Sequence, residues 1–296
     1  MGWFGAKNLL AGILRFPPVN AVVVGLGRQF LKADVLHRIP VPRRNVAYAL
    51  NNGKTVSLGQ ADRDLIAKDL FWGKSKPTSP AEAIKLEHLE RLCSNCSTFI
   101  DIGAYTGICA LIAARSSDHV RAIAYEIVPE NFLLLSQNIA NNDLLDRVEA
   151  RLCGLGAKAG SIRVPARLNL PSLATSVSLG SAFEEGVSVP VRTLDDETEA
   201  LIPPFVVKID VEGFEPEVLG GGQDFLSKHK PDIICEVLPD AGTAKKLEKL
   251  LKPLGYHFHE FTDSGLRARA SIKEGVEMRD WLFTVRDDYR AKTPKA

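Results

Sequence analysis

From Thr98 onward, short apolar runs alternate with helical segments, and this alternation restricts the fold more than any other feature of the chain. Strands are expected at 98–103, 121–127, 147–153, 205–211 and 232–238, with helices at 106–115, 129–141, 216–227 and 241–253. Two further strands are expected around 256–261 and 281–285. The pattern predicts an α/β fold with a mostly parallel, doubly wound sheet that carries helices on both faces. Ligands bind such sheets beyond the carboxyl ends of the strands, so polar residues there are candidate site residues.

The first expected strand runs into a glycine-bearing loop and a helix, with the sequence FIDIGAYTGICALIAAR over 99–115. Gly103 has no Cβ, so the chain can turn sharply there and a ligand can approach the backbone. The first amides of the following helix favour a polar or anionic group in the same space. We expect a nucleotide-like cofactor in this loop; the alternative is a tight strand-to-helix turn without a ligand.

The kind of nucleotide follows from the loop and from the end of the next strand. Glu126 lies about twenty residues beyond the glycine turn, the spacing of a carboxylate that binds ribose hydroxyls in NAD or S-adenosylmethionine sites. A dinucleotide fingerprint needs three glycines to hold a pyrophosphate, whereas here Tyr105 stands between Gly103 and Gly107. The carboxylate of Asp101 repels a pyrophosphate but suits the zwitterionic end of methionine. The loop therefore favours S-adenosylmethionine over NAD.

Five segments together resemble the FkbM family of S-adenosylmethionine-dependent methyltransferases. They are DIGAYTG, YEIVPENFLLLSQNI, VRTLDD, VVKIDVEGFEPEVLGGG and DIICEV, in an order and spacing that agree over 45–285. The resemblance implies a class I methyltransferase (Rossmann-like) fold and O-methylation of a hydroxyl of a sugar, glycan or other natural product. The family commonly has Asn at the position of Tyr105, so we expect the tyrosine ring to reshape the methionine pocket.

The cofactor contacts expected of this chain follow the strand ends. Asp101 and Gly103 are expected to hold the methionine portion and Glu126 the ribose, while Cys153 and Gly154 are placed by topology alone to face adenine. The full set expected to bind the cofactor is Asp101, Gly103, Ala104, Tyr105, Gly107, Glu126, Cys153, Gly154 and Asp210.

A lysine lies inside the fourth expected strand of this sheet. Lys208 shares one face of the strand with Asp210, and a charge in a covered sheet is costly unless it is paired. Asp210 lies ~7 Å along the strand, so a carboxylate on a neighbouring strand, with Glu236 the leading candidate, is an equal choice of partner. A Lys208–Glu236 ion pair that only fixes strand register is the structural alternative. Asp210, Glu212 and Glu236 should converge at one rim of the sheet.

These residues suit methyl transfer to an alcohol, in which the hydroxyl loses its proton as its oxygen attacks. A positioned base typically contributes about 10²- to 10⁴-fold to such a step. Asp210 is the first candidate for the base and Glu236 the second, with Lys208 and Glu212 completing the expected catalytic set. The carboxylates could instead hold Mg²⁺, and the sequence leaves base and metal open. The alternative functions are an NAD-dependent oxidoreductase and a non-catalytic S-adenosylmethionine-binding protein.

The chain is expected to have a helical and hairpin accessory region at 1–96, a catalytic domain at 97–286 and a polar tail at 287–296. A hairpin is expected over 45–58, and the irregular stretch 167–186, with Ser176 and Ser178, is expected to contact the substrate. The N-terminal apolar clusters are too short to span a bilayer. A helix at the N-terminus could place Trp3, Phe4, Leu9, Leu10, Ile13 and Leu14 on one face. We expect this face to pack on the domain rather than to contact a membrane surface.

Composition narrows the partners and the compartment. A formal net charge of +1 gives no bulk attraction to nucleic acid, so a small molecule or a glycan is the expected acceptor. The odd number of cysteines, 5, indicates a reducing, cytoplasmic location. Cys93 and Cys96 form an isolated C-x-x-C pair, for which neither a redox nor a zinc role is expected, and His257 and His259 are expected to be ordinary histidines. The oligomeric state is left open.

Overall fold

The computed structural model describes residues 19, 22, 26, 39–42, 44–168, 170, 172–181, 183–238, 242–272 and 280–287. Residues 1–18 and 288–296, which include much of the expected N-terminal helix and nearly all of the polar tail, lie outside these ranges. Within the described part of the chain, no helix combines the length and the apolar character that crossing a bilayer requires.

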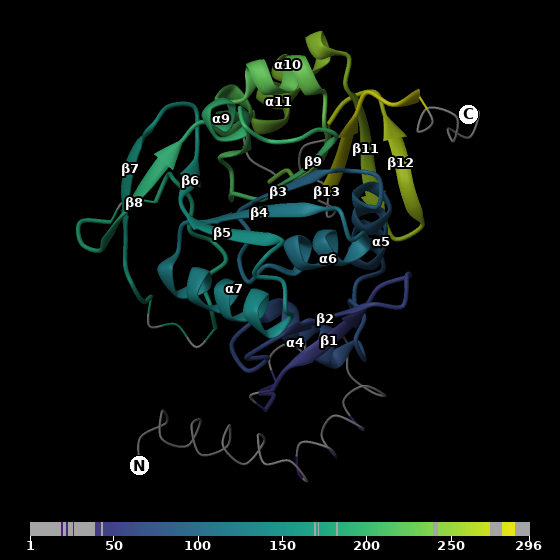
Figure 1. The fold of residues 1–296 in the computed structure, drawn as a ribbon, viewed down its shortest axis with the longest axis vertical. Helices are drawn as coiled ribbons and strands as arrows, with labels where there is room; N and C mark the ends of the chain where they lie inside the picture. The colour runs from purple at the N-terminus through teal and green to yellow at the C-terminus, as the bar shows by residue number, and fades with distance from the viewer. Residues whose placement is uncertain are drawn as a thin grey trace.

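The centre of the protein is an eight-stranded sheet in the order β12-β11-β13-β10-β9-β3-β4-β5 (Figure 1). The strands are β3 (Thr98–Ile102), β4 (Arg121–Glu126), β5 (Val148–Leu152), β9 (Phe205–Ile209), β10 (Asp232–Glu236), β11 (His257–Thr262), β12 (Gly265–Arg269) and β13 (Asp280–Thr284). Neighbours from β5 to β10 are parallel, whereas β13 is antiparallel to both β10 and β11. The expected mostly parallel, doubly wound sheet is confirmed.

Alternate residues of the strands enter two separate cores, one on each face of the sheet. Phe99 packs in the first core with α6 (Ile108–Ser116) and α7 (Pro129–Asn141). Ile100 and Ile102 pack in the second with α9 (Glu215–Gly220), α10 (Gln223–His229) and α11 (Thr243–Leu251). Figure 1 shows α6 and α7 on one side of the sheet and α9, α10 and α11 on the other. Because strand side chains alternate between faces, both faces are buried and the strands read as apolar runs.

The accessory elements share the first of these cores. They are β1 (Val46–Ala49), β2 (Thr55–Leu58), α4 (Leu65–Trp72) and α5 (Pro80–Cys93), and the expected hairpin over 45–58 is confirmed. Asn138 of α7 ties the hairpin to the glycine loop: its Oδ1 accepts the Gly59 N–H at 2.9 Å, and its Nδ2 donates to Thr106 O at 2.9 Å. This packing brings α4 and α5 to the carboxyl edge of the sheet.

The sequence did not predict a second, three-stranded sheet of β6 (Gly154–Leu155), β7 (Gly160–Val164) and β8 (Val187–Arg192). Val164 and Val189 are the only buried residues of β7 and β8, so the apolar alternation that marks a strand is weak. The stretch between β7 and β8 lacks regular structure where it is described, as expected.

The single helix expected at 216–227 is wrong, because α9 and α10 are separate helices that meet at Gly221 and Gly222. A Cβ on Gly221 would lie 2.1 Å from Gly156 O, so close backbone packing requires glycine there. The short helix α8 (Leu194–Thr198) was also missed.

Candidate functional site

A cavity of about 580 Å³ lies at the carboxyl edge of the central sheet, a usual size for a small-molecule site. Its walls come from the ends of β3, β4, β5, β9 and β10, from α4 and α5, and from residues 174, 175 and 177–179, whereas Ser176 is not among the lining residues. The chain leaves β3 towards β4 on one side and later returns to β9 on the other, so the cavity lies at the switch point of the sheet.

The two loop glycines have different surroundings. Gly103 lines the cavity with a φ of 78°, and a Cβ there would lie 1.8 Å from Asp210 O. Gly107 precedes α6 with a φ of 93°, and its Cβ would lie 2.4 Å from Leu135 Cδ1. Gly103 therefore allows the ends of β3 and β9 to meet at the cavity, whereas Gly107 allows α6 to pack on α7.

Asp101 does not line the cavity and is buried beneath the glycine loop, where it contacts α6 and Lys208. Its side chain is buried, its Oδ2 accepts the Ala110 N–H at 3.1 Å, and its Oδ1 lies 3.8 Å from Lys208 Nζ. Burial raises the pKa of the Asp101 carboxyl, although the Lys208 charge opposes this. The position of Asp101 suits orientation of α6 and Lys208 rather than the direct methionine contact expected from the sequence.

Glu126 lines the cavity at the end of β4 with both carboxylate oxygens held by backbone amides. Oε2 accepts the Tyr105 N–H at 2.8 Å, and Oε1 accepts the Val128 N–H at 2.7 Å. Burial raises the pKa of Glu126 to about 7, although these hydrogen bonds oppose the shift. The backbone of Ile127 also hydrogen-bonds this carboxylate. A carboxylate has about four acceptor positions, so about one remains for a hydroxyl donor such as that of a ribose.

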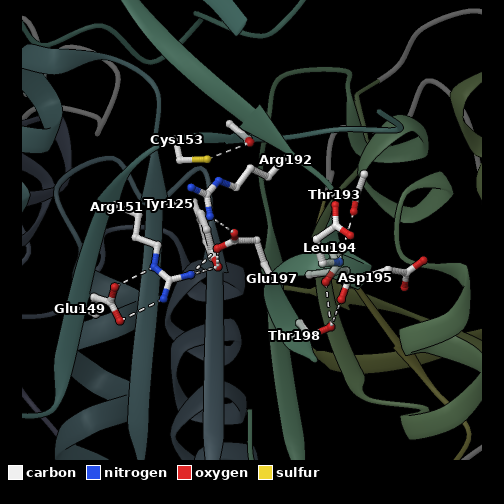
Figure 2. A network of polar contacts seen from close by, with 12 residues as sticks. Tyr125, Glu149, Arg151, Cys153, Arg192, Thr193, Leu194, Asp195, Glu197 and Thr198 are labelled. Atoms are coloured by element: carbon white, nitrogen blue, oxygen red, sulfur yellow. Dashed lines mark hydrogen bonds and ion pairs between the residues drawn. The ribbon is translucent and has the colours of Figure 1, made fainter. Parts of the chain in front are cut away.

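Cys153 and Gly154 line the cavity, as does Glu126. Figure 2 shows a polar network close to Cys153. The buried Glu197 accepts the Tyr125 hydroxyl at 2.8 Å and the Arg192 guanidinium at 2.8 Å, and it also pairs with Arg151. Burial acts to raise the pKa of Glu197, but these partners hold it below its usual value. The network joins β4, β5, β8 and α8, so it fixes the second sheet against the side of the cavity expected to hold adenine.

Sequence reasoning missed Glu197, although it lies one residue beyond the VRTLDD segment that carried part of the resemblance. Its burial depends on contacts with strands distant in the chain, and no local pattern reports those contacts.

Lys208 pairs with carboxylates of its own strand and of β3. Its Nζ lies 3.2 Å from Asp210 Oδ2 and 3.8 Å from Asp101 Oδ1, and it donates to Gly103 O at 3.1 Å. Burial acts to lower the pKa of Lys208, but Asp210 and Asp101 raise it well above its usual value. The neighbouring-strand carboxylate in this ion network is thus Asp101, whereas the sequence pointed to Glu236.

The structure brings Asp210, Glu212 and Glu236 together, with one ligand oxygen from each within 4.8 Å of the others. Asp210 and Glu236 share a hydrogen bond, and burial together with the Asp210 charge raises the pKa of Glu236 to about 9. Burial acts to raise the pKa of Asp210 too, but Lys208 lowers it overall. The directions of these shifts make Glu236 the more basic member of the pair. The three carboxylates also have the oxygen ligands and the spacing that a divalent cation needs.

Three cavity residues on α5 and β13 were not expected from the sequence. Lys85 Nζ lies 2.7 Å from Glu82 Oε2 and 3.1 Å from Asp280 Oδ1. Because β13 runs antiparallel to β10, its first residue, Asp280, is paired with Glu236 at the edge where the parallel strands end. Glu82 lies in the first turn of α5, where its N–H is capped by the Ser79 side chain. The strand direction and the docking of α5 decide these positions.

The other candidates take the following places. Ser178 lines the cavity, as do Ala104 and Tyr105, whereas His257 and His259 lie on β11 outside the cavity lining. Cys93 and Cys96 are buried free thiols.

The sequence matches the family described as Methyltransferase FkbM domain over residues 101–282. The curated protein Methyltransferase sdnD from Sordaria araneosa is 27% identical over 187 residues, which cover 53% of this chain and 72% of that protein. The crystal structure of Methyltransferase FkbM from Methylobacillus flagellatus KT has a TM-score of 0.43 and 20% identity, covering 64% of this chain and 43% of that one. The O-methyltransferase from Bacillus cereus, in complex with SAH, has a TM-score of 0.40 and 12% identity, covering 72% and 84% of the two chains. The chain thus spans less than half the length of the Methylobacillus protein.

Proposed function

The chain belongs to the FkbM methyltransferase family, and on this premise we propose that it transfers a methyl group from S-adenosylmethionine to a hydroxyl of a sugar, glycan or other small natural product. The observation that carries the proposal is one cavity lined by Gly103 and Glu126 at β3 and β4 and by Lys208 and Asp210 at β9. This arrangement supports a cofactor site and a proton acceptor within one space.

The residues at the β4 and β5 side of the cavity fit S-adenosylmethionine. Glu126 offers a remaining acceptor position for a ribose hydroxyl, Cys153 and Gly154 line the space beyond it, and Gly103 leaves the backbone uncovered. When bound, S-adenosylmethionine supplies a methyl group on a sulfonium. The names of the family and of the relatives give the reaction as methyl transfer. We propose in addition that the donor is S-adenosylmethionine and that the acceptor atom is an oxygen.

Asp210 is the proposed proton acceptor. The Lys208 charge and the hydrogen bond with Glu236 both lower the pKa of Asp210, which favours its ionised form. The hydroxyl oxygen becomes strongly acidic as its bond to the methyl carbon forms, and a carboxylate with a low pKa is then a sufficient base. With S-adenosylmethionine bound, the electron pair of its S–C bond would stay on sulfur as the methyl group transfers, and Asp210 would take up the hydroxyl proton. A divalent cation held by Asp210, Glu212 and Glu236 is the alternative means of acidifying the hydroxyl.

The charges around this side of the cavity support an acceptor without negative charge. Carboxylates of Asp210, Glu212, Glu236, Glu82 and Asp280 line it, against the two ammonium groups of Lys85 and Lys208. An acidic wall repels phosphate and carboxylate groups and disfavours the nucleic acid backbone.

The test combines binding and turnover. Isothermal titration calorimetry should show binding of S-adenosylhomocysteine, and a panel of sugars, glycolipids and hydroxylated metabolites should reveal methyl transfer from labelled S-adenosylmethionine. Asp210→Asn should lower the rate at least about 100-fold, whereas the surface variant Asp224→Asn should match the wild type.

Three outcomes separate the alternatives. Absence of S-adenosylhomocysteine binding together with saturable NADH binding would support the oxidoreductase. Cofactor binding without any effect of Asp210→Asn on turnover would remove Asp210 from the mechanism. Loss of turnover in EDTA with recovery on adding Mg²⁺ would favour the metal-assisted route.

A further inference from the structure

Tyr105 has an unusual backbone conformation in the middle of the glycine loop. Its φ of 52° lies in the left-handed region, which a bulky side chain rarely adopts. This conformation directs the Tyr105 N–H to Glu126 Oε2 at 2.8 Å. Such a conformation persists only where the surroundings hold it. The contacts of the Tyr105 side chain therefore influence the orientation of the Glu126 carboxylate in the cavity.

The Tyr105 side chain joins three parts of the structure that are distant in the sequence. Its hydroxyl accepts the Leu65 N–H of α4 at 3.2 Å. Its ring packs with Leu134 of α7 and with Leu173, and the three side chains form a small apolar cluster of their own. Burial, with a smaller effect of the nearby Asp64 charge, raises the pKa of the Tyr105 hydroxyl, so it stays neutral.

Leu173 belongs to the segment 172–181, which runs along the cavity without helix or strand. The segment is attached at its start: the Leu173 N–H donates to Arg63 O at 3.1 Å, and Asn131 Nδ2 donates to Ala174 O at 2.8 Å. Immediately beyond this attachment, residues 174, 175 and 177–179 line the cavity. Leu173 is 4% exposed, whereas Leu170, three residues earlier, is 49% exposed.

We infer that Tyr105 and Leu173 are positioning residues for the cofactor, acting as one apolar contact that holds segment 172–181 across the cavity beside Glu126. Neither residue touches the reacting atoms. The contact keeps the cavity wall in place while the Tyr105 backbone orients the Glu126 carboxylate. The inference rests on the proposed function, since S-adenosylmethionine is the ligand that this wall retains. In place of reshaping the methionine pocket, the tyrosine ring supports the wall of the cavity.

The rate of ligand release tests this inference directly. Dissociation of S-adenosylhomocysteine from the full chain is measured by surface plasmon resonance for the wild type and for the variants Leu173→Ala, Tyr105→Ala, the double variant and Tyr105→Phe. Leu173→Ala and Tyr105→Ala should each raise the dissociation rate about 5- to 10-fold, because most changes in affinity appear in the dissociation rate. The double variant should be no faster than the faster single variant, because both changes remove the same contact.

Two variants serve as controls. Tyr105→Phe keeps the ring packing and should change the dissociation rate less than about threefold. Leu170→Ala removes an exposed leucine three residues before Leu173 and should behave as the wild type. Thermal unfolding without ligand reports folding of each variant separately. If Tyr105→Ala does not fold, Leu173→Ala alone carries the test, because its segment lies outside the two main cores.

The outcomes distinguish this inference from the proposed function. If the wild type binds S-adenosylhomocysteine and folded Leu173→Ala releases it at the same rate, this inference is overturned but the proposed function is not. This holds even if the unfolding midpoint of the variant falls. Additive effects in the double variant also overturn it, because they show two independent contacts. A wild type that does not bind S-adenosylhomocysteine overturns the proposed function, and this inference with it.

Discussion

Affinity for S-adenosylhomocysteine should depend on pH through Glu126. Burial raises its pKa to about 7, so the ionised form that accepts ribose hydroxyls predominates only above that pH. If only this form binds, the dissociation constant exceeds that of the fully ionised protein by a factor of about 1.1 at pH 8 and about 11 at pH 6. Affinity at the two pH values then differs tenfold, or by about 1.4 kcal/mol. Affinity is therefore expected to be lost as pH falls.

The stability of the free protein should change in the opposite direction. The pKa of Glu126 is about 7 in the folded protein, against 4.5 for an unperturbed glutamate such as that of the unfolded chain. Between pH 4.5 and pH 7, Glu126 is therefore more often protonated in the folded protein than in the unfolded chain. The contribution of Glu126 to the free energy of unfolding is thus largest at low pH and falls as pH rises through this window.

Glu126→Gln isolates the effect. The Gln side chain keeps one acceptor oxygen, so its amide NH₂ must face the N–H of either Tyr105 or Val128. We expect a loss of about 1–3 kcal/mol in stability and a weaker affinity that no longer varies between pH 6 and pH 8. Calorimetric titrations at pH 6, 7 and 8 measure this, with the exposed Glu199→Gln as the matched control. An equal wild-type affinity at pH 6 and pH 8, or an unchanged pH dependence in Glu126→Gln, refutes the assignment of Glu126 to the ribose.

Two further predictions concern the junction of β3 and β9 and are measured by urea unfolding. Gly103→Ala places a Cβ 1.8 Å from Asp210 O and should destabilise the protein by more than about 2 kcal/mol; Gly220→Ala, which meets nothing within 4 Å, should be neutral or stabilising. Equal effects of the two substitutions contradict the close approach. Lys208→Met leaves the carboxylates of Asp101 and Asp210 without their cation and should cost about 3–5 kcal/mol near pH 7. The cost should shrink as pH falls and these carboxylates take up protons, and a cost independent of pH argues against the ion network.

The fold was largely readable from the sequence because its strands are covered on both faces. Continuous apolar runs separated by helical segments marked the central strands, and the order of motifs placed the site at their carboxyl ends. The sheet β6-β8-β7 was missed because β6 has only two residues, while β7 and β8 bury little and their polar residues resemble a loop. The junction of α9 and α10 was missed because it depends on the approach of Gly221 to Gly156, which is a tertiary contact.

For the site, the sequence by itself determined the strand-end residues Gly103, Glu126, Asp210 and Glu236, because each follows directly from where an apolar run stops. Only the tertiary structure decided their partners. Strand pairing put Asp101, in place of Glu236, in the ion network of Lys208, and the antiparallel direction of β13 brought Asp280 to the same edge. The docking of α5 added Lys85 and Glu82 to the cavity. Periodicity reports which face of an element is buried, but which side chains meet across elements depends on register, strand direction and packing, which no local pattern encodes.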